Sequence, residues 1–404
     1  MKKYNKITPQ GTRDRLFEEC AARGEISRKL SRLFESRGYS EIITPALEYY
    51  DVFSGSDSGF SQEEMYKLTD AAGRLLVLRP DITLPIARVA ATRLKDAPPP
   101  LRLCYTAPVY RVNAGFTGRS NEILQSGMEL LGASGIRADL EIITAGIEAL
   151  SECGAPDFRV EIGHGGFISG LLGGLSLEPQ AAQELRGCVE CKDYVALGRI
   201  LEKAPPSPAR ELLLSLPKLS GGAQVLEYAK SLCGDKACKG ALSYLEKIYA
   251  DLGRLGHGDK ITIDLSLTHS NRYYTGVIFR GYIQGSGVTV LSGGRYDGLL
   301  EEFGAPMPAT GFAVENDALS EALAAGGQAP KMSRPAALVF GRDAYEMEAQ
   351  LHMDSLIASG LVCELSLDDT EEQARRRAEK RGIPRLDIVG ETTETVYLKE
   401  NVSQ

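Results

Sequence analysis

"PPPLRLCYTAPVYRVNAGFTGRSNEILQSGMELLG", residues 98–132, contains two apolar runs joined by a polar loop. The runs are 98–112 and 121–132, and the loop between them contains glycine, asparagine and serine. Two strand-like runs around a glycine-containing loop predict an antiparallel β-hairpin. Within the second run, Gln125 and Glu129 are four residues apart, so on a strand their side chains point to the same face.

The segments before this hairpin predict a helix and then an extended stretch. "CAARGEISRKLSRLFESRGY" (20–39) has apolar residues at helical spacing and a glycine near its end, which is a natural stop. "SEIITPALEYY" (40–50) is typical of extended structure. Its proline, Pro45, favours an edge or an interface over the centre of a sheet.

Downstream of the hairpin, the pattern predicts more strands with a helical insertion between them. Segments 157–164 and 261–267 are expected strands, and 276–283 with 288–294 is an expected hairpin. From about 165 to 258 the composition shifts toward Leu, Ala, Glu and Lys, which favours helices. This segment therefore reads as a helical insertion into a sheet domain.

The last part of the chain predicts a separate small domain. A linker-like stretch at 324–334 is followed by alternating strand and helix patterns, which indicate an α/β domain with a partly parallel sheet. The expected fold class is therefore α+β: a largely antiparallel sheet flanked by helices, with the helical insertion and a small C-terminal α/β domain. The expected boundaries are 1–325, including the insertion, and 335–404.

Composition excludes several classes of function. The net charge of −8 and the pI near 5.3 give no general attraction to nucleic acid or to anionic membranes. No run approaches the roughly 18 apolar residues of a membrane helix, and the basic N-terminus lacks the apolar core of a signal peptide. We therefore expect a cytoplasmic protein without a membrane partner.

The cysteines and histidines give no clear metal site. Cys188 and Cys191 form a CxxC pair, and Cys233 and Cys238 lie downstream, so a four-thiolate zinc site and a set of reduced thiols are both conceivable. The four histidines lack metal-ligand spacing, and we expect no metal. The glycine-rich segment 292–298 lacks the phosphate-loop pattern and is more typical of a tight turn with close backbone approach.

Several polar residues beside the apolar strands could bind a zwitterion. Acidic side chains and an amide would accept bonds from an ammonium group, and a guanidinium would bind a carboxylate through charge-assisted bonds. An alternative is that each is a solvated or structural group. His269 and the adjacent tyrosines Tyr273 and Tyr274 raise the same question, and an extended stretch would point the two tyrosines to opposite faces. The candidates for such a pocket are Asp81, Arg111, Gln125, Glu129 and one of the two tyrosines.

The segments taken in order resemble a class II aminoacyl-tRNA synthetase, specifically the histidyl one. The resemblance covers residues 1–164 and 258–325, and the last 70 or so residues resemble a shortened anticodon-binding domain. It implies a dimer that meets around Pro45. The matching segments are "TPQGTRD" (8–14), "RGYSEIITPALE" (37–48), "LRPDIT" (78–83), "VYRVNAGFTGRSNEILQSGMELLG" (109–132), "NRYYTGVIF" (271–279), "LSGGRYDGLLEEFG" (291–304) and "MPATGFAVENDAL" (307–319).

The departures from that family fall on its nucleotide contacts. Where the family has a catalytic arginine, a motif glutamate and an ATP-gripping arginine, this chain has His269, Asn113 and Ala318. Each lost charge-assisted contact costs on the order of 1.5–3 kcal/mol. The resemblance therefore implies a non-catalytic protein whose ATP site is broken.

The amino-acid contacts are kept, although Asp81 is one methylene shorter than the family's glutamate. By the resemblance, Asp81, Thr83 and Gln125 surround the ammonium group of a histidine ligand, and Arg111 with Gln125 meets its carboxylate. Glu129 and Tyr273 meet the imidazole, Tyr274 lies beside them, and Arg119 keeps its place in the hairpin loop. The histidine-binding residues implied are Asp81, Thr83, Arg111, Gln125, Glu129, Tyr273 and Tyr274.

A kept histidine pocket beside a broken nucleotide site resembles the regulatory subunits of ATP phosphoribosyltransferase. That family implies a complex with a short-form catalytic subunit in the first step of histidine biosynthesis, with L-histidine as effector. It implies no cofactor and no tRNA partner. Two alternatives remain open at this point: a divergent but active histidyl-tRNA synthetase, and a synthetase-like protein that serves another partner.

Overall fold

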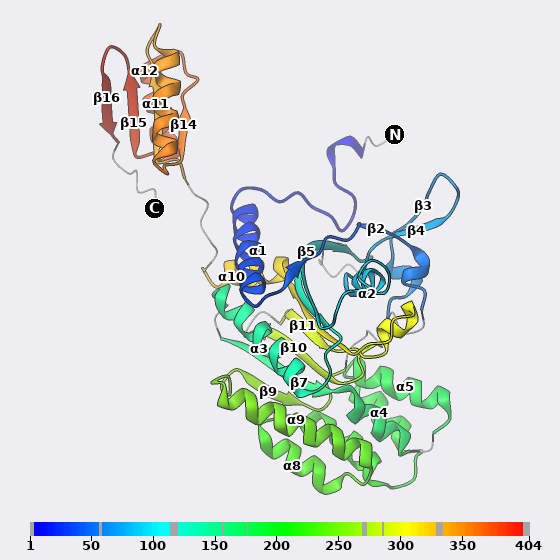
Figure 1. Ribbon diagram of the computed structural model, residues 1–404. Helices are drawn as coiled ribbons and strands as arrows, with labels where there is room; N and C mark the ends of the chain where they lie inside the picture. Colours follow the sequence, from blue (N-terminus) through cyan, green and yellow to red (C-terminus); the bar gives the residue numbers. More distant parts are fainter. Residues whose placement is uncertain are drawn as a thin grey trace. The chain divides into compact units, whose positions relative to one another are not determined.

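A nine-stranded sheet organises the first of two structural units in the computed structural model, which comprise residues 1–330 and 331–404 (Figure 1). The structure describes residues 4–55, 59–113, 120–155, 157–175, 177–268, 273–284, 287–328 and 334–398. Within these ranges, no helix combines the length and the apolar character needed to cross a membrane.

The helices and strands of the first unit are the following. The helices are α1 (Glu18–Ser36), α2 (Thr83–Thr92), α3 (Ile136–Glu152), α4 (Gly165–Gly173), α5 (Pro179–Glu190), α6 (Tyr194–Leu201), α7 (Pro208–Ser215), α8 (Ala223–Leu232), α9 (Lys236–Arg254) and α10 (Asn316–Ala325). The strands are β1 (Ser40–Glu41), β2 (Leu47–Tyr49), β3 (Lys67–Thr69), β4 (Leu75–Leu78), β5 (Leu101–Tyr110), β6 (Glu122–Leu131), β7 (Phe158–His164), β8 (Ser220–Gly221), β9 (Ile261–Asp264), β10 (Val277–Ile283), β11 (Thr289–Arg295) and β12 (Ala309–Glu315). Short 3-10 helices include η3 (Gln62–Glu64) and η5 (Leu299–Phe303).

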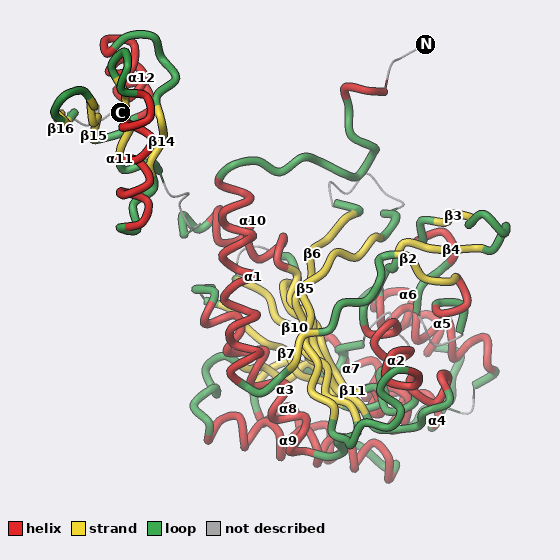
Figure 2. The backbone as a smooth tube through the Cα atoms, turned by 45° about the horizontal axis from the view of Figure 1, so that its top comes forward, coloured by secondary structure: helices red, strands yellow, loops and turns green. Residues whose placement is uncertain are grey.

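The large sheet has the order β1-β5-β6-β12-β11-β10-β7-β9-β8. The hairpin predicted from residues 98–132 is confirmed: β5 and β6 pair antiparallel along their full length, from Leu101 opposite Leu131 to Tyr110 opposite Glu122. The hairpin predicted at 276–294 is β10 and β11, which also pair antiparallel. Among the described strands of this large sheet, only β1 with β5 and β7 with β9 are parallel pairs. Figure 2 shows these strands as one twisted layer.

The two faces of this sheet are covered differently, because successive residues of a strand point to opposite sides. On β6, Met128 and Leu130 pack with α1, α3 and α10 in the main core. Glu129 and Leu131 point the other way, toward α2 and η5, where a second apolar cluster lies. The same alternation puts Gln125 on the Glu129 side, as predicted. The second face is where the sheet can hold a ligand.

The segment around Pro45 lies at two sheet edges, which confirms the edge prediction. β1 is the outermost strand of the large sheet, and β2 is an edge strand of a small three-stranded sheet of order β2-β4-β3. Pro45 lies between β1 and β2 and belongs to neither strand. A proline lacks the N–H that a central strand needs, and Pro45 lies where the chain passes from one sheet to the other.

The segment between β7 and β9 is mostly helical, as predicted, and contains α4 to α9 with the short strand β8. A buried carboxylate joins these helices to the sheet. Asp139 of α3 pairs with Arg295 of β11, with Oδ1 and Nη2 2.7 Å apart. Its Oδ2 accepts a bond of 2.6 Å from the hydroxyl of Tyr244 on α9. Asp139 is wholly shielded from solvent, so both partners compensate the cost of burying its charge.

The second unit is a small α/β sandwich. Its strands are β13 (Ala337–Gly341), β14 (Cys363–Leu365), β15 (Arg385–Val389) and β16 (Thr393–Tyr397), in the order β14-β13-β15-β16. β13 is parallel to both neighbours, and β16 is antiparallel to β15. The helices α11 (Glu346–Ala358) and α12 (Glu371–Arg381) pack on opposite faces of this sheet. The partly parallel α/β pattern predicted from the sequence is confirmed.

Candidate functional site

A cavity of about 150 Å³ lies on the second face of the large sheet. Its walls come from β5, β6, β11, β12, the start of α2 and the turn before β10. The seven predicted histidine-binding residues, Asp81, Thr83, Arg111, Gln125, Glu129, Tyr273 and Tyr274, all line it. The remaining lining residues are Gly59, Phe60, Glu64, Tyr105, Ser292, Tyr296, Gly311, Phe312, Ala313 and Glu315.

Glu129 lies at the inner end of this cavity, in the middle of β6. Its Oε1 accepts a bond of 2.8 Å from Thr83 Oγ1, and its Oε2 accepts one from the hydroxyl of Tyr296. Gly311 is opposite Glu129 on β12, and a Cβ there would lie 1.8 Å from Oε2, so only glycine leaves room for the carboxylate. Burial raises the pKa of Glu129 to about 8, against the lowering effect of its two donors.

Asp81 provides a second buried carboxylate, just before α2. Its Oδ1 accepts a bond of 3.0 Å from the backbone N–H of Leu84, and burial raises its pKa. Arg111, after β5, donates from Nε to the carbonyl of Pro80 at 2.8 Å, and its guanidinium lies 5.5 Å from the centre of the Phe60 ring. Two carboxylates at one end and a guanidinium held over an aromatic ring suit a zwitterion.

The two adjacent tyrosines both line the cavity, so the expectation that they point to opposite faces is wrong. Their ring centres are 4.8 Å apart, and the Tyr273 ring meets the Tyr296 ring edge-on at 5.7 Å. The reason is local backbone geometry: Tyr273 lies in a turn, Tyr274 and Thr275 belong to no strand, and β10 begins only at Val277. The strict alternation of a strand therefore does not apply to them.

Tyr105, Tyr296 and Glu315 are among the lining residues that were not predicted. Tyr296 and Tyr105 add two buried hydroxyl-bearing rings to the inner wall, and Glu315 adds a carboxylate at the end of β12. Leu103 is opposite Glu129 in the hairpin and Tyr105 is two residues further along β5, so period-2 reasoning could have found Tyr105 once the register was known. Tyr296 follows the glycine-rich stretch of β11, where Gly293 and Gly294 approach the neighbouring strands closely. The close-approach interpretation of that stretch is confirmed, although most of it is strand and the turn follows.

Two of the three positions that depart from the synthetases, Asn113 and Ala318, have ordinary structural roles. The Asn113 side chain donates to Asn121 Oδ1 at 3.0 Å and to the Ser120 carbonyl at 3.1 Å. Ala318, on α10, packs against the main core. His269 and Arg119 lie outside the described residues.

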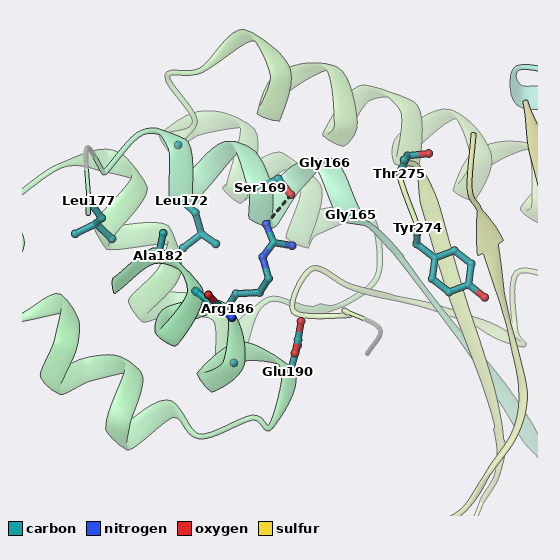
Figure 3. Close-up of a pocket in the computed structure, with 13 residues that line it drawn as sticks. Gly165, Gly166, Ser169, Leu172, Leu177, Ala182, Arg186, Glu190, Tyr274 and Thr275 are labelled. Atoms are coloured by element: carbon teal, nitrogen blue, oxygen red, sulfur yellow. Dashed lines mark hydrogen bonds between the residues drawn. The ribbon is translucent and has the colours of Figure 1, made fainter. Parts of the chain in front are cut away.

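A larger cavity of about 900 Å³ opens between the helical insertion and the turn that contains Tyr274 and Thr275. Figure 3 shows Arg186 of α5 reaching toward Ser169 of α4, where Nη2 and Oγ are 3.2 Å apart. Tyr274 lines both this cavity and the smaller pocket.

The cysteines are not brought together as a metal site in the described part of the chain, where no group of three or more His, Cys, Asp or Glu side chains could hold an ion. Cys233 and Cys238 are buried, whereas Cys188 is half-buried and Cys191 is exposed. The four thiols of the conceivable zinc site thus have unlike surroundings.

Comparison with known proteins relates most of the chain to histidyl-tRNA synthetases and to ATP phosphoribosyltransferase regulatory subunits. A sequence model of the family described as histidyl-tRNA synthetase matches residues 11–319. The chain is 39% identical over 391 residues to the ATP phosphoribosyltransferase regulatory subunit of Clostridium kluyveri, covering 96% of this chain and 100% of that protein. It is 41% identical over 326 residues to the protein of the same name from Bacillus mycoides, covering 80% of this chain and 77% of that one.

A solved structure shows the same arrangement of elements. It is described as an ATP phosphoribosyltransferase regulatory subunit/histidyl-tRNA synthetase from Bacillus halodurans. The TM-score is 0.83 at 34% sequence identity, over 93% of this chain and 97% of the other.

Proposed function

The chain belongs to the family of ATP phosphoribosyltransferase regulatory subunits, with a class II synthetase-like fold, and we propose that it senses histidine for a short-form catalytic subunit. In this proposal the complex condenses ATP with phosphoribosyl pyrophosphate, the first step of histidine biosynthesis. The chain activates its catalytic partner and makes that partner responsive to L-histidine.

The observation that supports this proposal most directly is that the seven residues implied as histidine contacts line one cavity. We assign the ammonium group of L-histidine to Asp81, Thr83 and Gln125, and its carboxylate to Arg111 and Gln125. The imidazole then lies against Glu129 and the tyrosine rings. A buried carboxylate beside a ring N–H gives specificity for a polar ring, because an apolar ring would leave Glu129 without that partner.

We propose further that the pocket does not activate histidine with ATP. The support is chemical: histidine, asparagine and alanine at positions 269, 113 and 318 replace the charged groups that contact ATP in the synthetases the sequence resembles. Adenylation relies on positive charge placed at the phosphates. The names of the relatives give no support to the alternative of a divergent active synthetase.

A tRNA partner is also not part of the proposal. The basic side chains of α12 are largely engaged by acidic neighbours: Arg376 with Glu372, and Arg377 with Asp368 at 3.3 Å. Arg381 pairs with Glu364 in the same way. With the net charge of −8, the C-terminal unit offers little unpaired positive charge for a phosphate backbone.

A symmetric homodimer is proposed around segment 40–50 and α1. On the small sheet, one face carries apolar side chains that remain open to solvent in the single chain, including Leu47, Tyr49 and Leu68, which are 47%, 44% and 43% exposed. Ile43, 84% exposed, extends this apolar surface toward β1. An uncovered apolar face rimmed by polar residues is typical of a protein–protein interface. A twofold contact uses the same patch from both copies.

The test combines binding and regulation. The purified chain is mixed with a short-form ATP phosphoribosyltransferase, and complex formation, activity and inhibition by L-histidine are measured. The proposal expects a stable complex, higher activity than the catalytic subunit alone, and histidine inhibition that weakens in the Glu129→Gln variant. Absence of any complex with the wild-type chain would reject it and favour another partner.

A further inference from the structure

We propose that the larger cavity, between the helical insertion and the segment before β10, binds a small organic anion whose acidic head group contacts Arg186 and Ser169. The ligand class is a carboxylate or a phosphate monoester that carries an apolar body. This site is separate from the histidine contacts assigned above and does not depend on them.

The cavity has the size of a site for a small organic molecule. Its volume is about 900 Å³, and pockets that bind small molecules measure about 300–1,000 Å³. Two of its lining glycines leave space open: a Cβ built on Gly173, at the end of α4, or on Gly187, in α5, would meet no other atom within 4 Å. A larger side chain at Gly187 would therefore occupy the cavity without displacing its neighbours.

Arg186 provides the positive charge of this site. Among the described residues that line the cavity, it is the only cationic side chain. It reaches from α5 toward α4, where its Nη2 donates to Ser169 Oγ at 3.2 Å (Figure 3). Within the described part of the chain, no carboxylate forms an ion pair with Arg186, although Glu190 lies one helical turn away on the same helix. A guanidinium has several N–H donors, so others remain for a ligand.

Arg186 and Ser169 together can hold an acidic head group. Because Ser169 Oγ accepts from Arg186, its own hydrogen remains available to donate to an oxygen of the ligand. A guanidinium binds carboxylate and phosphate oxygens through charge-assisted bonds, which are stronger than bonds between neutral groups. Arg186 is half-buried, and salt screens a partly buried charge less than a fully exposed one.

The other walls favour an organic body over a bare inorganic anion. Figure 3 shows Leu172, Leu177 and Ala182 to one side of Arg186 and the Tyr274 ring to the other. Aliphatic and aromatic surface is stabilised when an apolar ligand covers it, whereas an inorganic anion would leave it in water. The cavity therefore suits a ligand with charge at one point and apolar surface beside it.

The experiment compares three derivatives of methylumbelliferone that share one aromatic body. The phosphate ester and the carboxymethyl ether are anions, and the methyl ether is uncharged. Titration calorimetry on the full chain gives their dissociation constants. The wild type should bind at least one anion about 10-fold more tightly than the methyl ether, the factor that a hydrogen bond to a charged group supplies. The tighter of the two anions identifies the head group. Equal affinity for all three, or no measurable binding of either anion, would overturn the site.

Two variants test the charge and the space separately. Arg186→Gln should remove the difference between the anion and the methyl ether. Gly187→Leu fills the cavity and should weaken the anion by about 10-fold or more, and leucine is a better helix former than glycine, so α5 should remain folded. The matched controls are Arg199→Gln on α6 and Gly240→Leu on α9, both at exposed positions outside the cavity, and they should bind like the wild type. Wild-type affinity in both Arg186→Gln and Gly187→Leu would overturn the inference.

Arg111→Gln excludes the histidine pocket as the source of the signal. Arg111 is the cationic side chain among the described residues of that smaller pocket, so it could also attract an anion. The affinity for the anion should stay close to that of the wild type in this variant. Binding that is lost in Arg111→Gln and kept in Arg186→Gln would assign the ligand to the smaller pocket and reject the larger one. Failure of L-histidine to bind would reject the histidine pocket and leave these results unaffected.

Discussion

The hydroxyl of Tyr296 donates a hydrogen bond to Oε2 of Glu129, and it does so across an intervening strand. Tyr296 follows β11 and Glu129 lies in β6, with β12 between them; the glycine of β12 opposite Glu129 leaves the space for this contact. With Thr83 on its other oxygen, Glu129 is oriented before any ligand arrives. This preorganisation lowers the cost of ordering side chains when a ligand binds.

Glu129→Gln should weaken L-histidine binding by about 1.5–3 kcal/mol, because the ring N–H of the ligand favours the ionised form of Glu129 and a hydrogen bond to a charged group is of this size. Tyr273→Phe removes only a hydroxyl and should cost about 0.5–1.5 kcal/mol. Titration calorimetry on the isolated chain and on the complex measures both. Unchanged affinity in Glu129→Gln, in both settings, would mean that histidine is read elsewhere.

The raised pKa of Glu129 should make stability depend on pH. The folded chain keeps this proton up to about pH 8, whereas an unfolded glutamate loses it near 4.5. Between these values the folded state binds more protons, so the free energy of unfolding falls as pH rises. The stabilising contribution is complete below about 4.5 and is lost as pH passes 8.

Urea unfolding from pH 5 to 9 tests this point. Across this pH range, the free energy of unfolding of Glu129→Gln should fall by roughly 2–4 kcal/mol less than that of the wild type, since one unit of pKa difference corresponds to about 1.4 kcal/mol. Glu227→Gln, exposed on α8, should track the wild type. Parallel pH profiles for the wild type and Glu129→Gln would show that the residue does not titrate in this range.

The purified chain should not form histidyl-adenylate. Histidine-dependent exchange of pyrophosphate with ATP is the direct assay, and it should remain at background with L-histidine present. An authentic histidyl-tRNA synthetase serves as the positive control. Exchange at a rate near that of the control would restore the active-synthetase alternative.

Breaking the apolar face of the small sheet should dissociate the proposed dimer. Leu47→Asp together with Leu68→Asp places two charges on residues that are already partly exposed, so the folded chain should tolerate them. Light scattering at micromolar concentration should give a dimer for the wild type and a monomer for this variant. Val195→Asp, at a 68% exposed position on α6, is the matched control and should stay dimeric. A monomeric wild type would contradict the interface.

The parts of the site that could be predicted from the sequence are those governed by local periodicity. Gln125 and Glu129 share a face because a strand alternates with period two, and the pattern shows this without knowledge of the neighbours. Tyr273 and Tyr274 line the same cavity, whereas an extended stretch would have placed them on opposite faces, because the chain is not a strand at these two residues. Tyr296 was missed because its contact with Glu129 depends on β12 lying between two strands that are far apart in sequence.

The same difference between local and non-local signals applies to whole helices and strands. Hairpins and helices with clear periodicity were predicted well, whereas the change of sheet at Pro45 is set by which strands pair, a non-local property. Glu315 had no readable signal in the sequence. It ends the apolar strand β12 directly before α10, and only the structure shows that it lines the cavity.

Asp139 ties the helical segment between β7 and β9 to the sheet, so this segment is a structural part of the domain and could not simply be removed. Arg295 of the sheet donates to both carboxylate oxygens of Asp139, and Tyr244 of α9 donates to Oδ2 as well. Deleting the helices would remove the Tyr244 hydroxyl donor and expose the buried Asp139–Arg295 ion pair to solvent. Arg295 is the residue next to Tyr296, which lines the pocket. A minimal version of this protein, reduced to its sheet and pocket, would therefore begin with a damaged pocket wall.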